Sequence, residues 1–242
     1  MGVERLISGL AASLSLMLAA APVLAQTAPA SEFDQGGKIC IGSQGQVNAE
    51  PLPDWIGPAL AAMDQTPAEM TFSFRQVGAD RVLYATGEID ENAAAHLQAA
   101  LDRFGPINEI HFNSPGGDSA QGEAIGHVIR KHGKVTTRVV QGNGCASACS
   151  TAFLGGFFRQ IDPGALYGIH LFSRAFDKDM VVKPEEWSII TQIEARLIGG
   201  RAVYISKMGI STDWLNEWVN THPDCMLFFS QELLKKSFVD NF

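Results

Sequence analysis

Apolar and polar residues alternate along two neighbouring segments, and the spacing then changes to that of helices. The alternation predicts strands at 71–77 and 81–86, which Gly78-Ala79-Asp80 joins as a hairpin. Further along, runs with apolar residues three and four positions apart take turns with short apolar runs. The elements expected there are a helix at 91–104, a strand at 107–112, a helix at 118–131 and a strand at 135–140. This order predicts an α/β fold with parallel strands joined by right-handed crossovers.

The second half of the chain is expected to contain one long helix among shorter elements. Residues 185–208 have the apolar spacing of a helix, and Gly209 is expected to end it. The other elements expected are a short helix that opens within 145–154, a strand at 165–171, a helix capped by Ser211 or Thr212 that runs to Val219, a strand at 226–229 and a helix at 231–238.

The first 25 residues have the pattern of a secretory signal peptide. Arg5 precedes an apolar stretch at 6–21, and Val23-Leu24-Ala25 forms a small-x-small cleavage site. An uncleaved anchor helix is the alternative, because the stretch nearly reaches membrane-spanning length. Pro22 and the cleavage pattern favour removal. The protein is therefore expected to work in the periplasm.

A second segment, residues 26–69, is rich in Ala, Pro, Gly and Gln. This composition predicts a partly disordered extension with a short ordered piece around Ile39-Cys40-Ile41. The folded domain is expected at 70–242.

Composition excludes some classes of function. Of the 242 residues 46% are apolar and 18% charged, which favours a packed core. The net charge of −8 argues against a nucleic-acid partner, because phosphate binding needs clustered Lys and Arg. No Cys-x-x-Cys or His pair supports a metal site. Neither a metal nor a cofactor is expected.

Four cysteines in an exported chain permit disulfides. They are Cys40, Cys145, Cys149 and Cys225, and three pairings are open. Cys145 and Cys149 lie one helical turn apart, an awkward geometry for a bridge. A bridge from Cys40 or Cys225 to one of them is therefore preferred.

Ser147 is the candidate nucleophile. It lies in a run of small residues, Gly144 to Ser150, where a loop enters a helix and backbone N–H groups lack partners. A serine needs a base to take its proton and donors to hold the oxyanion. Ser150 is a rival nucleophile, and ordinary packing of small residues is an equally good explanation.

The oxyanion donors and the base have candidates on either side of this run. Gly117, in Asn113-Ser114-Pro115-Gly116-Gly117, and Ala148 offer backbone N–H groups. His170 follows an expected strand and is the candidate base. His222 is a weaker candidate, and Lys178 or Lys183 would be needed for a Ser-Lys dyad. A lone histidine on a strand is more often structural.

These motifs resemble, in order and spacing, the Clp protease proteolytic subunit (ClpP), a member of the crotonase superfamily. The resemblance covers roughly residues 81–240 and rests on Gly87-Glu88-Ile89-Asp90, Asn113 to Gly117, Gly122, Ala146-Ser147 with Phe153-Leu154, Ile169-His170, Phe228 to Glu232 and Phe238-Val239-Asp240. The Cys-x-Ser-Ala-Cys segment resembles exported, periplasmic relatives.

The resemblance implies a ClpP/crotonase-like fold of stacked βαβ units with a protruding long helix, and serine peptidase chemistry. Ser147 would be the nucleophile, His170 the base, and Gly117 and Ala148 the oxyanion donors. Asp224 matches the family's third catalytic residue, although it lies about two residues further from Phe228 than the family pattern has it.

Partners follow from the same resemblance. It implies a peptide or unfolded-protein substrate and a homo-oligomer built through the helix at 185–208. No ATPase partner is expected, because the periplasm has no ATP supply. The shifted Asp and the Cys residues around Ser147 motivate the alternative, a catalytically silent binding or scaffold protein. An acyl-coenzyme A enzyme of the crotonase superfamily is disfavoured by export.

Overall fold

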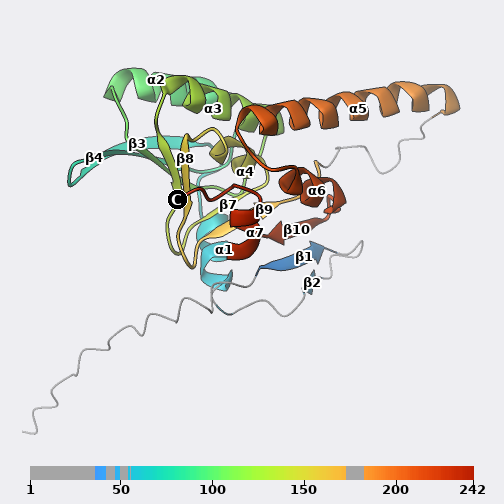
Figure 1. Cartoon of the computed structure of the whole chain (residues 1–242), viewed down its shortest axis with the longest axis horizontal. Coiled ribbons are helices and arrows are strands. Elements are labelled where there is room, and N and C mark those ends of the chain that lie inside the picture. Colours follow the sequence, from blue (N-terminus) through green and yellow to red (C-terminus); the bar gives the residue numbers. More distant parts are fainter. Residues whose placement is uncertain (1–35, 42–46, 50–53, 55, 173–182) are drawn as a thin grey trace, which may run out of the picture.

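The computed structural model describes residues 36–41, 47–49, 54, 56–172 and 183–242. The expected signal peptide at 1–25 and Lys178 lie outside these residues. Within the described part of the chain the fold is α/β, as expected, with two five-stranded sheets and seven helices (Figure 1).

The first sheet holds the hairpin and the parallel strands that the apolar pattern predicts. β3 pairs with β4 in antiparallel register, and β4, β5, β6 and β8 are parallel in that order. The bounds are β3 Thr71–Val77, β4 Asp80–Thr86, β5 Glu109–Asn113, β6 Thr136–Val139 and β8 Phe158–Ile161. β8 was not predicted from the sequence, because only two of its four side chains are buried.

Two amphipathic helices lie beside each other over this sheet, α2 (Ala93–Phe104) and α3 (Ser119–His132) (Figure 1). Gly105 and Gly133, both at positive φ, follow the last residues of these helices. The predicted start of α2 at residue 91 was two residues early. The Asp90 carboxylate accepts from the Asn92 and Met70 N–H groups, so it fixes the turn before the helix.

The second sheet collects strands from distant parts of the chain in the order β2-β1-β10-β9-β7. β7 and β9 are parallel, and β10 is antiparallel to both β9 and β1. Their bounds are β1 Gly37–Ile41, β2 Val47–Ala49, β7 Gly144–Ala146, β9 Leu166–Ile169 and β10 Cys225–Phe228. The three-residue strand β7 was not predicted, since Gly and Ala carry little strand signal.

The segment 26–69, for which an extension was predicted, contributes more order than the expected piece around Ile39. It contains β1, β2 and an unpredicted helix, α1 (Ile56–Asp64). Ile56, Ala59 and Met63 on α1 are buried, and they pack with Leu166 and Phe228 of the second sheet. α1 packs against β7 and β9 of this sheet.

The C-terminal helices are α5 (Pro184–Lys207), α6 (Thr212–Asn220) and α7 (Gln231–Lys236), close to the predicted ranges. Only the last turns of α5 are buried, and its N-terminal part projects away from the body of the molecule (Figure 1). None of the described helices is both long enough and apolar enough to cross a membrane.

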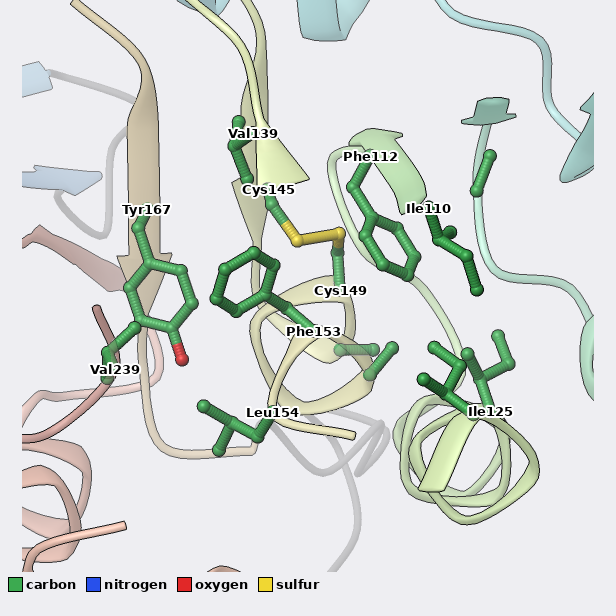
Figure 2. Packing of buried hydrophobic residues seen from close by; sticks show 14 of the residues in the cluster. Ile110, Phe112, Ile125, Val139, Cys145, Cys149, Phe153, Leu154, Tyr167 and Val239 are labelled. Carbon is green, nitrogen blue, oxygen red and sulfur yellow. A yellow bond between two sulfur atoms is a disulfide. The ribbon is translucent and has the colours of Figure 1, made fainter. Parts of the chain in front are cut away.

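The main core surrounds α4 (Ala148–Phe153), all six residues of which are buried. Figure 2 shows the Cys145–Cys149 disulfide at its centre, with Phe112, Phe153 and Tyr167 around it. Phe153 packs edge-on against both of the other rings. The helix that follows Ser147 is therefore fixed by packing on all sides.

Two arginines hold the end of α4 against the end of α5. Arg130 and the buried Arg159 each donate to the carbonyl of Gly156 over 2.9 Å and to that of Met208 over 3.4 Å. Burial lowers the pKa of Arg159 to about 10. These cations satisfy carbonyl groups that the two helix ends leave without partners.

The predicted disulfide pairing was wrong. The bridges are Cys40–Cys225 and Cys145–Cys149. Cys40 and Cys225 face each other across the antiparallel pair β1–β10. Cys145 and Cys149 do not share a helix, because Cys145 belongs to a strand and the chain turns at Ser147 before α4 begins. Their Cα atoms lie 5.2 Å apart, within the range a bridge spans.

The contact between α3 and α5 allows a matched pair of substitutions. A Cβ at Gly126 would lie 1.8 Å from the Tyr204 hydroxyl, which is buried and donates to the Thr151 carbonyl. Gly126→Ala is expected to lower the free energy of unfolding by about 1–3 kcal/mol.

Gly199→Ala is the control, since no atom lies within 4 Å of the added methyl group. It should raise the free energy of unfolding by up to about 1 kcal/mol, because alanine is the better helix former. Urea unfolding followed by circular dichroism measures both. Equal effects of the two substitutions would contradict the packing described.

Candidate active site

Ser147 stands at a sharp reversal between β7 and α4. Its φ of 56° and ψ of −122° lie in a region that residues other than glycine rarely adopt. The Ser147 N–H donates to the Gly168 carbonyl on β9 over 3.0 Å, and the Ser147 carbonyl accepts from the Ser150 N–H over 3.1 Å. The Cys145–Cys149 bridge spans the same turn. The backbone on both sides thus imposes the strained conformation.

Glycines allow neighbouring backbone to approach this turn. A Cβ at Gly116 would lie 2.7 Å from the Cβ of Ser147. A Cβ at Gly122 on α3 would lie 2.4 Å from the Ala148 carbonyl oxygen. Asn113 forms a hydrogen bond to the start of β7, since its Oδ1 accepts from the Gly144 N–H over 3.1 Å. The motif that starts at Asn113 therefore packs directly on the serine turn.

His170 follows β9 and reaches the serine. Its Nε2 lies 2.7 Å from Ser147 Oγ. β9 places it there, because β7 and β9 are parallel neighbours and Ala146 is paired with Gly168. With Ser147 as donor, Nε2 accepts and Nδ1 carries the ring proton. This geometry is that of a nucleophile and its base.

The electrostatics of His170 favour the neutral imidazole. Burial lowers the pKa of His170, and the backbone of Pro223 and Leu171 opposes part of the shift. Nδ1 is buried and has no well-directed hydrogen bond to any described residue. A neutral ring at neutral pH is the form that accepts a proton from serine.

Asp224 does not complete this pair in the structure. Its side chain is 65% exposed, and its Oδ2 lies 3.7 Å from Nδ1 of His222, which is 68% exposed. The Asp224 N–H donates to the same His222 Nδ1 over 3.2 Å. The tight turn from His222 to Cys225 directs the carboxylate to solvent, and the backbone of Pro223 lies near His170 instead. The match of motifs along the sequence could not resolve the direction of this side chain.

The oxyanion candidates line the same cavity as the serine and histidine. The cavity has a volume of about 170 Å³, and Gly117, Ser147, Ala148 and His170 are among its lining residues. The N–H groups of Gly117 and Ala148 donate to no backbone acceptor within the described ranges.

The direction of the Gly117 N–H follows from its neighbours. The Ile89 N–H donates to the Gly116 carbonyl over 2.6 Å, and the Asp118 N–H donates to the Ile89 carbonyl over 2.8 Å. Gly117 and Ile89 form an isolated parallel bridge, and its hydrogen bonds go to the residues on either side of Gly117. Since Asp118 donates towards Ile89, the Gly117 N–H points away from Ile89.

Ser150, the rival nucleophile, is 1% exposed and is not among the residues that line the cavity. Its Oγ donates to the Ser147 carbonyl over 2.6 Å. The hydroxyl thus supports the turn from inside.

Sequence reasoning missed the other residues that line the cavity. The remaining lining residues are Ser119, Thr151, Phe172, Arg201 and Trp218. Arg201 is buried within the last turns of α5, and it was passed over because the helical pattern was read from apolar residues alone. A charged residue on the buried side of an amphipathic helix was the available signal.

Among the described residues, no group of three or more His, Cys, Asp or Glu side chains is arranged to hold a metal ion.

The pKa of His170 predicts the pH dependence of any reaction at Ser147. Because burial disfavours the imidazolium, the base stays neutral below the usual histidine value of about 6.5. The rate at which a fluorophosphonate labels Ser147 should therefore hold down to that pH and fall only below it. His222→Gln, which removes the exposed histidine, should leave the profile unchanged. An acid limb at or above pH 6.5 would count against a buried neutral base.

The two disulfides are expected to have separate effects. Loop entropy predicts that Cys40→Ala/Cys225→Ala lowers the free energy of unfolding by about 5 kcal/mol, because these residues are 185 positions apart. For Cys145→Ala/Cys149→Ala, whose residues are 4 positions apart, the predicted decrease is about 2 kcal/mol. Removing the Cys145–Cys149 bridge should instead slow labelling of Ser147 by up to about 100-fold, because the turn at Ser147 becomes less constrained. Thermal unfolding and labelling rates measure the two effects, and the reverse ranking would refute this division.

No family model matches the sequence, and neither does any curated protein. Solved structures do match. They include a mutant of the 1510-N membrane-bound stomatin-specific protease, at 16% identity over 66% of this chain and 75% of that one with a TM-score of 0.46. ClpP1 from Listeria monocytogenes matches at 21% identity over 66% and 87%, with a TM-score of 0.43. The ClpP protease catalytic domain from Plasmodium falciparum matches at 18% identity over 66% and 82%, with a TM-score of 0.43. At these values the chain is similar to those proteases in general architecture, and its function has to be argued from its own side chains.

Proposed function

We propose that the protein is a serine peptidase that works by acyl transfer. The observation that carries the proposal is the 2.7 Å contact between Ser147 Oγ and His170 Nε2, at a cavity that Gly117 and Ala148 also line. A serine held at positive φ beside a neutral, half-buried imidazole is arranged as an activated nucleophile.

The reaction follows from these groups. Ser147 Oγ attacks the carbonyl carbon of a peptide bond while its proton passes to His170 Nε2. The carbonyl oxygen becomes an oxyanion, which accepts from the Gly117 and Ala148 N–H groups. The intermediate then collapses, the C–N bond breaks, and His170 returns the proton to the leaving amine. Water, deprotonated by the same imidazole, releases the acyl group and restores Ser147.

The space around the site suits an extended peptide. A hollow of about 650 Å³ adjoins the reactive cavity and shares Ser119, Phe172, Arg201 and Trp218 with it. It extends over the start of α3 and gives room for substrate residues next to the bond that is cleaved. This supports a peptide or unfolded protein segment as the substrate.

A catalytically silent binding protein is the second candidate. It is favoured by one observation, the His170 Nδ1 that has no well-directed partner among the described residues while Asp224 pairs with His222. An imidazole without an acidic partner is oriented less well and stabilised less when it takes a proton, so catalysis would be weaker.

Location and assembly are part of the proposal. The two disulfides support an oxidising compartment, as a periplasmic protein would have. Apolar side chains exposed along α5 support a homo-oligomer formed through this helix. They are Trp187, Ile189, Ile193, Leu197 and Val203.

The test is covalent labelling of the purified protein by a fluorophosphonate, which reacts with activated serines. Label is expected on the wild type and on Ser150→Ala, and it should be absent from Ser147→Ala. Peptide hydrolysis should fall about 10⁴-fold or more in Ser147→Ala. Loss of label only in Ser150→Ala would show that Ser150, and not Ser147, is the nucleophile. A folded wild type that takes no label would leave the silent binding protein as the better candidate.

A further inference from the structure

A buried cation is among the residues that line the reactive cavity. Arg201 is 6% exposed and lines the cavity together with Ser147, Gly117 and Ala148. It comes from the buried last turns of α5. The guanidinium and the proposed oxyanion donors thus border one space of about 170 Å³.

Neutral groups hold the guanidinium in place. Nη1 donates to Thr151 Oγ1 over 2.6 Å, and Nη2 donates to Ser119 Oγ over 2.9 Å. The guanidinium carbon lies 5.4 Å from the centre of the Trp218 ring, at cation–π distance. Arginine has five N–H donors, so these two hydrogen bonds leave others for a ligand.

Within the described ranges no carboxylate lies at ion-pair distance from Arg201. The charge of Glu123 acts on it from a distance, and the Glu123 carboxylate lies 3.9 Å from His127 instead. Buried charges are normally paired, because removing a charge from water costs much free energy. Burial lowers the pKa of Arg201, yet an arginine stays protonated at neutral pH. Among the described residues the cation therefore has no close anionic partner, although its burial calls for one.

The position of the cation indicates where that partner would come from. When a peptide carbonyl oxygen lies between the Gly117 and Ala148 N–H groups, the side chain of the same residue is the group close enough to enter the cavity. The cavity has room for one such side chain. A carboxylate on it would pair with the guanidinium through charge-assisted hydrogen bonds, which no described carboxylate does.

We propose that this cavity is a carboxylate subsite, in which Arg201 selects Asp or Glu as the residue whose carbonyl Ser147 attacks. The inference rests on the proposed function and adds a substrate class to it. Arg201 acts in binding, and Ser119 and Thr151 orient its guanidinium. A free carboxylate at the end of a peptide has the same chemistry, and the substrates below separate the two sources.

The experiment compares internally quenched peptides that differ at one residue: Glu, Asp, Gln, Asn or Leu. The Glu and Asp peptides should be cleaved after that residue, with kcat/KM about 10- to 100-fold above the amide peptides. In a second set of peptides the chain ends one residue after the test residue. Each of these peptides is made with its C-terminus either as a free carboxylic acid or as an amide. A preference confined to free acids would keep the carboxylate subsite and assign the carboxylate to the chain end.

Variants attribute the preference to Arg201. Arg201→Gln should reduce the Glu/Gln ratio of kcat/KM to near one, and Arg201→Lys should keep a ratio above one because the charge remains. Ser119→Asp leaves the buried arginine intact and supplies a competing carboxylate, so it should also abolish the preference. The ratio is taken within each variant, which removes general losses of activity. Ser119→Asp keeps the test valid if Arg201→Gln does not fold.

Fluorophosphonate labelling separates the two proposals. A wild type that labels at Ser147 but cleaves Glu and Gln peptides equally, or prefers Leu, would overturn the carboxylate subsite and leave the peptidase proposal standing. A folded wild type without label would overturn both. A Glu preference that persists in Arg201→Gln and in Ser119→Asp would also refute the role of Arg201.

Discussion

The reversal of the backbone at Ser147 is the constraint on which the site depends. A serine at positive φ is stable only where its surroundings leave no alternative. Here the Ser147 N–H donates to β9, the Ser147 carbonyl accepts from Ser150, and a disulfide joins Cys145 and Cys149 across the turn. The same strand β9 carries the chain on to His170, so one strand pairing fixes both the conformation of the serine and its distance from the imidazole. Packing of α4 in the core then removes the remaining freedom of the turn.

Much of this arrangement could be predicted from the sequence, because it rests on local patterns. Apolar spacing predicted the hairpin at 71–86, the helices that Gly105 and Gly133 end, and the long helix near residues 185–208. Ser147, His170, Gly117 and Ala148 were singled out by glycines and small residues at strand ends, and they line one cavity. Their catalytic roles stay predictions until a reaction is measured.

The rest depended on tertiary contacts that no local pattern contains. β7 is a strand because β9 and Ser114 hydrogen-bond to its two sides, and α1 is buried by the distant Leu166 and Phe228. The Cys145–Cys149 bridge looked unfavourable while both residues were assigned to one helix, and the positive φ between them makes it feasible. The burial of Arg201 is set by elements far away in sequence, such as the helix that carries Thr151.

The bridge between Cys40 and Cys225 has a further consequence. It ties the first described strand to the last, across 185 positions, so almost the whole fold lies within one covalent ring. A single cut in any loop between these residues would open the ring without releasing a fragment. A molecule nicked by a peptidase would therefore keep its mass until it was reduced, and its two pieces would remain paired through β1 and β10. Damage of this kind would be invisible on a non-reducing gel, and a nicked molecule could still hold its strands in register.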